Sequence, residues 1–214
     1  MNQKVVFEIK KFEIKNKRKN LPATVFFTDR KKISAANCDL ESTIKNLPKH
    51  SAIIVREYDL NKQDREIFAQ KIISLARPLS LKVLIGKDII LAKKLKSDGV
   101  HFSDFDHLPL QALRKKSFPK KFIFSFSCHN LKSVLKASKS QFDMVFISPI
   151  FPTTSHLSTK NLGLINLAKI SLKTKKPPYC LSSLYALGGV NSSNISSLRK
   201  LNLSGLAAIN LFLR

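Results

Sequence analysis

Eight short apolar runs, separated by polar and glycine-containing segments, constrain the fold of this 214-residue chain most strongly. Each run is only a few residues long, which is typical of a strand and too short for a buried helix. Runs without alternating polar residues indicate strands that are buried on both faces, as in a parallel sheet. The runs cover residues 24–27, 52–55, 82–85, 99–102, 122–126, 144–147, 184–187 and 206–209.

Helix patterns lie between these runs. Residues 68–76 place their apolar side chains on one helix face, and Pro78 marks the end of that helix. Asp88, Asn130 and Asn191 each precede a further helix pattern and are residue types that cap helix N-termini. Strands and helices therefore alternate with short connections, which predicts a parallel sheet. Eight such units close into a compact (βα)8 TIM barrel more readily than they form an open sheet.

The first and last units of this predicted barrel are incomplete. Between Leu40 and Leu47 there is room for only a short helix, and Arg214 follows the last run closely. We therefore expect the eighth helix to be short or missing. The flank left open would be covered by residues 1–20, a basic N-terminal extension with the pattern of a short strand or helix, or by a second subunit in a homo-oligomer. The barrel domain is expected to span residues 21–214.

The chain is strongly basic, with 38 Lys and Arg residues, 14 Asp and Glu residues and a formal net charge of +24 at pH 7. Residues 1–20 hold seven cations against Glu8 and Glu13, a net of +5, so most of the excess lies elsewhere. A field of this sign attracts phosphate-bearing ligands. A nucleic-acid-binding module is one explanation. Because the lysines are spread along the chain, solvated helix faces are the simpler one, and nucleic acid is the less favoured partner.

The sequence shows no sign of a membrane or secretory segment. No run reaches the roughly 18 apolar residues of a membrane-spanning helix, and the first residues lack the apolar stretch of a signal peptide. Cys38, Cys128 and Cys180 are widely spaced, which fits free thiols in a reducing compartment better than disulfides or a zinc site. We therefore expect a cytoplasmic protein without a membrane partner.

Small, hydroxyl-bearing and glycine residues follow several of the predicted strands. Residues 148–156 follow one strand and Gly188-Gly189 another, while Ile209-Asn210 end the last. In a barrel of parallel strands, the carboxyl ends of the strands form the rim of the active site. Backbone amides at the last two strand ends are expected to form a phosphate-binding cradle. The pattern therefore favours an enzyme that handles a phosphorylated small molecule.

The motifs at these strand ends, taken in order, resemble those of the thiamine-phosphate synthase/TenI superfamily. The matching segments are ATVFFTDR at 23–30, VREYDL at 55–60, DGVHF at 98–102, SCH at 127–129, FPTTSH at 151–156 and LGGV at 187–190. The resemblance implies a synthase of thiamine biosynthesis that joins a hydroxymethylpyrimidine pyrophosphate to a thiazole phosphate, with Mg²⁺ as cofactor. Pyrophosphate would leave first, and the thiazole nitrogen would then attack the resulting cation.

The resemblance implies three catalytic residues on the pyrophosphate side. Arg56 matches a family arginine, and its guanidinium group can hold a phosphate with two hydrogen bonds. The alternative for Arg56 is an ion pair with Glu57 or another carboxylate of the rim. Ser127, with His129, matches a loop that touches pyrophosphate, and a simple polar loop is its alternative. His156 stands where the family has lysine, so it would carry charge only while its imidazole is protonated.

Four further residues are expected to contact the substrates. Thr153 and Ser155 match hydroxyl groups that hold the thiazole carboxylate or pyrophosphate. His101 lies at a strand end, where it either contacts substrate or is packed and hydrogen-bonded in the interior. Lys87 replaces a family aspartate that binds magnesium, and its ammonium group would then mimic part of the charge of the metal.

The expected magnesium site is incomplete. Asp106 falls on one family carboxylate, and Asp88 would have to shift into the role of the other, with helix capping as its alternative. Ile54, Tyr58 and Gly86 also replace a glutamine, a lysine and an asparagine of the family pattern. These departures leave open a second hypothesis, a non-catalytic TenI-like protein that binds a phosphorylated ligand.

Overall fold

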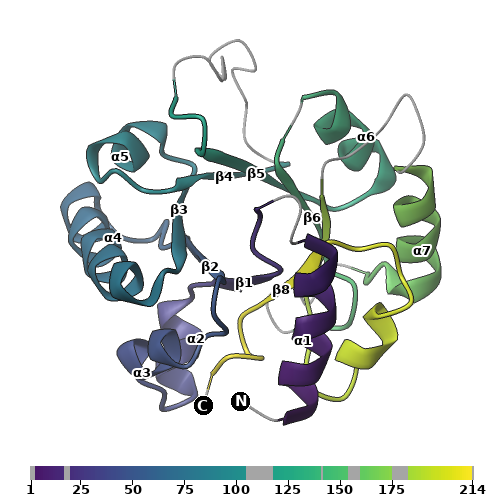
Figure 1. Ribbon diagram of the computed structural model, residues 1–214. Coiled ribbons are helices and arrows are strands. Elements are labelled where there is room, and N and C mark those ends of the chain that lie inside the picture. The colour runs from purple at the N-terminus through teal and green to yellow at the C-terminus, as the bar shows by residue number, and fades with distance from the viewer. Residues whose placement is uncertain are drawn as a thin grey trace.

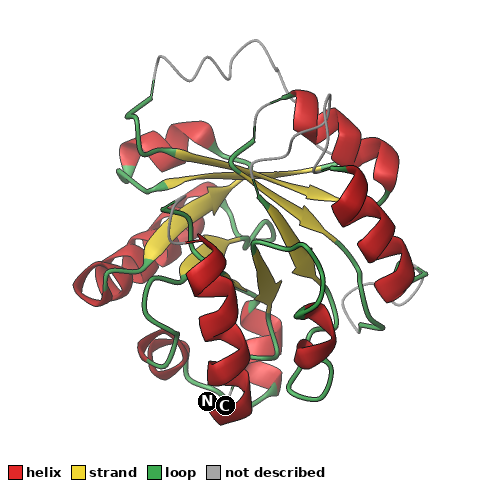
Figure 2. Cartoon of the chain, turned by 45° about the vertical axis from the view of Figure 1, so that its right-hand side comes forward, coloured by secondary structure: helices red, strands yellow, loops and turns green. Residues whose placement is uncertain are grey.

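A computed structural model describes residues 3–16, 20–104, 118–140, 142–153, 160–174 and 183–213 of the chain. Eight parallel strands form a closed barrel in chain order, and β8 pairs with β1 so that Ala207 lies beside Val25. The strands are β1 (Thr24–Phe27), β2 (Ala52–Val55), β3 (Lys82–Gly86), β4 (Gly99–Ser103), β5 (Ile123–Cys128), β6 (Met144–Ile147), β7 (Leu184–Leu187) and β8 (Gly205–Ala208). The predicted (βα)8 barrel is confirmed (Figures 1 and 2).

Helices surround the barrel on its outer side (Figure 2). They are α1 (Gln3–Asn16), α2 (Arg30–Ala35), α3 (Leu40–Lys45), α4 (Lys62–Ala76), α5 (Ile89–Lys94), α6 (Leu131–Lys139) and α7 (Gly163–Lys173), with the 3₁₀ turns η1 (Arg77–Leu79) and η3 (Ile195–Leu198). Asp88 and Asn130 cap α5 and α6 as expected. Asn191 does not cap an α-helix; its Oδ1 accepts hydrogen bonds from Ser193 and Asn194 in the turn before η3. Within the described ranges, no helix is long and apolar enough to span a membrane.

Side chains along each strand alternate between two hydrophobic clusters. In β1, Val25 and Phe27 face the barrel interior, whereas Phe26 packs against the surrounding helices. Both sets are buried, which explains why the strands read as continuous apolar runs. The interior is filled by large side chains such as Phe146 and Tyr185. Ligand-binding space is therefore confined to the ends of the barrel.

Helix α1 covers the flank of the barrel beside β8. Its side chains Val5, Ile9 and Phe12 are at most 2 % exposed, and the helix contacts β8 and η3. Glu8 on the same face is buried, with its carboxylate 3.4 Å from the Lys11 ammonium and 4.0 Å from the Arg199 guanidinium. No helix follows β8 among the described residues up to 213. The N-terminal segment thus takes the place that an eighth helix would occupy.

The two cysteines within the described residues are free thiols, as expected. Cys38 and Cys128 form no disulfide, and Cys180 lies outside the described residues. Burial raises the pKa of the Cys128 thiol far above its ordinary value. This thiol is therefore protonated and unreactive at neutral pH.

Candidate functional site

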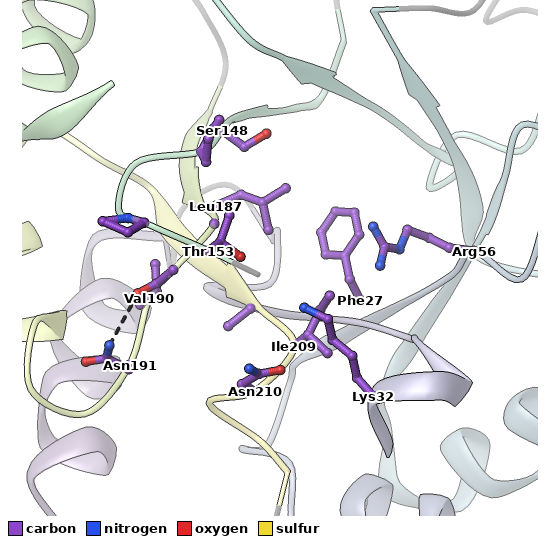
Figure 3. A pocket seen from close by; sticks show the side chains of 15 residues that line it. Phe27, Lys32, Arg56, Ser148, Thr153, Leu187, Val190, Asn191, Ile209 and Asn210 are labelled. Atoms are coloured by element: carbon purple, nitrogen blue, oxygen red, sulfur yellow. Dashed lines mark hydrogen bonds between the residues drawn. The ribbon is translucent and has the colours of Figure 1, made fainter. Parts of the chain in front are cut away.

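A cavity of about 200 Å³ opens at the carboxyl ends of the strands (Figure 3). Loops after β1, β2, β6, β7 and β8 contribute to it. Its wall is formed by Phe27, Lys32, Arg56, Ser148, Pro149, Pro152, Thr153, Leu187, Gly188, Gly189, Val190, Asn191, Ala208, Ile209 and Asn210. The residues that sequence analysis assigned to ligand binding and that meet in this cavity are Arg56, Thr153, Gly188, Gly189, Ile209 and Asn210.

The turn after β7 can only be built from glycine. Gly188 and Gly189 have φ values of 89° and 69°, in the left-handed region. A Cβ on Gly188 would lie 2.8 Å from Pro149 Cα, and one on Gly189 would lie 2.7 Å from Phe151 O. Within the described part of the chain, no hydrogen bond uses the backbone N–H groups of residues 188–190. Such a run of unused amides at a strand end can bind an anion.

Arg56 follows β2 and reaches the same cavity. Its Nε donates a hydrogen bond to Thr28 O (3.3 Å), and its Nη2 lies 3.7 Å from the Asp29 carboxylate. Its guanidinium lies 5.4 Å from the centre of the Phe27 ring. The side chain is 28 % exposed, so these contacts hold the cation in the cavity wall without covering it.

Glu57 is not the ion-pair partner of Arg56. Its buried carboxylate accepts hydrogen bonds from Thr28 Oγ1 (2.7 Å) and from the backbone N–H of Arg56 (3.1 Å). The guanidinium instead approaches Asp29, which is another carboxylate of the rim. Glu57 therefore joins the loops after β1 and β2 and positions Arg56 through its main chain.

Lys32 is a cation of the cavity wall that sequence analysis missed. It lies in the first turn of α2, a helix that was not predicted, and α2 begins after Asp29 as its N-cap. Burial and the neighbouring Arg56 lower the pKa of the Lys32 ammonium, while Asp29 acts in the opposite direction. Figure 3 shows the side chain directed into the cavity, whose wall also includes Asn210. The detectable sign of this helix start was Asp29, because aspartate is a residue type that caps helix N-termini.

His101 is packed in the barrel interior. It is 2 % exposed, its Nδ1 is hydrogen-bonded with Ser125 Oγ (2.9 Å) and its Nε2 with Ser127 Oγ (3.1 Å). Its ring meets Phe27 and Phe146 edge-on. Neither His101 nor Ser127 belongs to the cavity wall. Of the two alternatives for His101, the structure shows the packed and hydrogen-bonded one.

His129 supports the loop after β6. The hydrogen bond between its Nδ1 and Ser148 O (3.0 Å) requires a proton on that nitrogen. Its backbone N–H donates to the Asp104 carboxylate (3.2 Å). Because Ser148 lines the cavity, His129 acts on the site through the position of this loop.

At the rim between β2 and β3, the side chain of Tyr58 fills the space that a side chain at residue 86 would need. A Cβ on residue 86 would lie 2.5 Å from Tyr58 Oη and 2.8 Å from Val55 O. The ring of Tyr58 lies against two cations, with the Lys87 ammonium 4.9 Å and the Arg65 guanidinium 5.4 Å from its centre. The departures from the family pattern at 58 and 86 are therefore structurally coupled. Lys87 contacts this ring and does not line the cavity.

This coupling predicts a result for Gly86→Ala. The added methyl group would collide with Tyr58 and Val55 O, so we expect the free energy of unfolding to fall by about 1–3 kcal/mol. Adding Tyr58→Ser should restore part of the lost stability, because it removes the collision with the tyrosine side chain. The rescue should be incomplete, because the collision with Val55 O remains. Urea unfolding of the two single variants and the double variant measures the coupling. Strictly additive effects would contradict the contact between the two residues.

The magnesium carboxylates are not assembled among the described residues. Asp88 Oδ1 accepts a hydrogen bond from Leu91 N (2.8 Å), and Oδ2 lies 3.6 Å from Arg65 Nη1. Both oxygens of Asp88 are thus engaged, as the capping alternative requires. In the described ranges, no group of three metal-ligating side chains comes together. Of the two expected magnesium carboxylates, the described residues include only Asp88. Asp106, Ser155 and His156 lie outside the described residues.

Comparison with known proteins agrees with this arrangement. A family model described as thiamine monophosphate synthase matches residues 24–212. The chain is 31% identical over 195 residues to a protein of Aquifex aeolicus named "Putative thiamine-phosphate synthase 2", covering 90% of this chain and 98% of that protein. It is 25% identical over 198 residues to a thiamine-phosphate synthase of Clostridium tetani, covering 91% and 90% of the two proteins.

A solved structure of a thiamine phosphate pyrophosphorylase from Pyrococcus furiosus has the same fold. It superimposes with a TM-score of 0.69 at 20% identity and covers 91% of this chain and 88% of that one. The family match extends over all eight strands and the cavity at their carboxyl ends. The chain therefore belongs to the thiamine monophosphate synthase (TMP-TENI) family.

Proposed function

We propose that this protein joins a hydroxymethylpyrimidine pyrophosphate to a thiazole phosphate and releases pyrophosphate. The observation that carries the proposal is a single cavity whose wall holds both a turn with unused amides at 188–190 and the cations Lys32 and Arg56. Guanidinium groups and runs of backbone amides both bind phosphate, so one cavity that holds both can take two phosphate-bearing substrates. Relatives named thiamine-phosphate synthase support phosphorylated small molecules as substrates.

In the proposed reaction, the bond between the pyrimidine methylene carbon and the pyrophosphate oxygen breaks, and pyrophosphate leaves with the electron pair. The lone pair of the thiazole nitrogen then forms the new carbon–nitrogen bond. Arg56 would stabilise the negative charge that develops on the leaving oxygen. The turn at 188–190 would hold the thiazole phosphate so that its nitrogen faces the pyrimidine. No proton has to be transferred in these two steps.

The proposal is tested by binding followed by product formation. Isothermal titration with thiazole phosphate should show saturable binding. Adding the pyrimidine pyrophosphate should then yield thiamine phosphate and pyrophosphate in equal amounts. The reaction is run with and without Mg²⁺, because the family resemblance predicts a magnesium requirement that the described residues do not explain. Absence of product under both conditions would overturn the proposed reaction.

Arg56→Ala is expected to lower kcat/KM by roughly 10²–10³, because one charge contact to the leaving group is worth a few kcal/mol. Arg56→Lys should recover only part of the activity, since an ammonium group cannot make two parallel hydrogen bonds to phosphate. Initial rates of pyrophosphate release measure both effects. An Arg56→Ala variant with the wild-type rate would show that catalysis takes place elsewhere.

A second candidate function is binding of a phosphorylated ligand without catalysis. It is favoured by the rim between β2 and β3, where Tyr58 covers Gly86 and Lys87 lies against the tyrosine ring. These residues stand where the family resemblance places pyrophosphate and metal contacts. Binding of thiazole phosphate without any product would support this function over the synthase.

A further inference from the structure

We propose that Lys32 is a substrate-binding residue whose ammonium group contacts the phosphate ester held by the turn at 188–190. The identity of the ester, a thiazole phosphate, rests on the proposed function. The site itself would accept the dianion of any phosphate monoester that fits the cavity. The family motifs named above do not include Lys32. The motif after β1 ends at Arg30, and Lys32 lies farther along in α2.

The position of Lys32 is fixed by its own helix. Asp29 Oδ1 accepts a hydrogen bond from the Lys32 backbone N–H (3.1 Å), and Asp29 O accepts one from Ile33 N (2.9 Å). The Ile33 side chain is buried in the hydrophobic core. The neighbouring side chain, Lys32, is directed into the cavity instead, as Figure 3 shows.

The charges around Lys32 favour an anion in the cavity. Two cations, Lys32 and Arg56, line the wall, and no carboxylate does so among the described residues. Asp29 is the carboxylate that acts on both cations, and it already caps α2 and approaches Arg56 at 3.7 Å. The cavity wall therefore holds a net positive charge together with the amides at 188–190. A phosphate dianion placed between them would meet donors on both sides.

Burial of the ammonium supports the same conclusion. It lowers the pKa of Lys32, with Arg56 as a further cause, so the charged form is less stable here than in water. A bound dianion would reverse this effect because it favours the charged form.

The inference is tested with Lys32→Met and the matched control Lys31→Met. Lys31 is the adjacent residue, its side chain is 82 % exposed, and its ammonium lies 3.5 Å from the Asp59 carboxylate, outside the cavity wall. Isothermal titration is carried out with inorganic phosphate, with thiazole phosphate and with the same thiazole lacking its phosphate. Thermal unfolding of each variant is measured with and without inorganic phosphate.

Lys32→Met should weaken binding of inorganic phosphate and thiazole phosphate by about 10- to 100-fold, the range for one charge-assisted hydrogen bond. Binding of the unphosphorylated thiazole should not change. The rise in melting temperature on adding phosphate should be smaller in Lys32→Met than in the wild type. Lys32→Arg should restore most of the phosphate affinity, and Lys31→Met should behave like the wild type.

Wild-type phosphate affinity in Lys32→Met would overturn the inference, and so would an equal loss in Lys31→Met. A Lys32→Met variant whose melting temperature rises on adding phosphate as much as that of the wild type would overturn it as well. These outcomes are separate from the fate of the proposed reaction. If phosphate binding depends on Lys32 but no thiamine phosphate forms, the role of Lys32 is supported and the proposed synthase reaction is rejected. If thiamine phosphate forms at the same rate in Lys32→Met as in the wild type, the synthase reaction is supported and the role of Lys32 is rejected.

Discussion

Replacing Gly189 with aspartate is expected to abolish binding of thiazole phosphate. The new side chain would bring a carboxylate to the turn that receives the phosphate, and its Cβ would collide with the carbonyl groups of Phe151 and Pro152. The φ value of 69° adds backbone strain in any residue other than glycine. Isothermal titration should show no heat of binding, and the melting temperature should fall by several degrees. If Gly189→Asp binds thiazole phosphate with unchanged affinity, the phosphate does not bind at this turn.

The electrostatic part of this effect can be isolated at Asn210. Asn210→Asp changes the charge in the cavity wall with almost no change in shape. At a separation of about 5 Å and an effective dielectric constant of about 20, two unit negative charges repel by about 3 kcal/mol. We therefore expect thiazole phosphate to bind roughly a hundredfold more weakly to this variant. Asn210→Ala is the uncharged control and should lose much less. Equal losses would show that charge is not the cause.

Phe12→Ala is expected to lower the free energy of unfolding by about 3–5 kcal/mol, the usual cost of truncating a buried aromatic side chain. Phe12 is 2 % exposed on the face of α1 that covers the barrel flank. The matched control is Phe7→Ala on the same helix, where the ring is 59 % exposed and lies beside the Lys11 ammonium. That substitution should change stability by no more than about 0.5 kcal/mol. Urea unfolding measures both variants.

Comparable losses in the two variants would contradict the placement of α1 against β8. Another element would then have to bury the flank of the barrel beside β8. The alternative considered from the sequence is a second subunit of a homo-oligomer. Sedimentation of the wild type and of Phe12→Ala at several concentrations would detect such a partner. A monomer that depends on Phe12 for its stability would support α1 as the element that completes the barrel.

The strands were predictable from sequence alone. Four predicted runs, including 24–27 and 144–147, coincide with the observed strands, and the other four differ by one or two residues at one or both ends. The reason is physical: a strand buried on both faces has to be apolar along its whole length, so its position is a local property of the sequence. The caps of α5 and α6 were predictable for the same reason, because Asp88 and Asn130 bind amides three residues away.

The first two helices of the chain were harder to predict. Helix α2 is only six residues long and has a single buried side chain, Ile33, so it carries almost no apolar periodicity. Residues 1–20 showed an ambiguous pattern, and only contact with β8 gives the apolar face of α1 a surface to cover. Isolated helices of this length are marginal in water, so tertiary packing decides whether they form.

The sequence by itself determined the barrel, the edge at which the cavity lies and the glycine turn at 188–189. Only the tertiary structure decided which polar side chains face that cavity. His101 and Lys32 both lie near strand ends, yet Ser125 and Ser127 satisfy the histidine in the interior, whereas Lys32 lines the cavity. Which of the two reaches a ligand depends on side chains from other strands and loops. Those neighbours are distant in the chain, and the closed barrel alone brings them together.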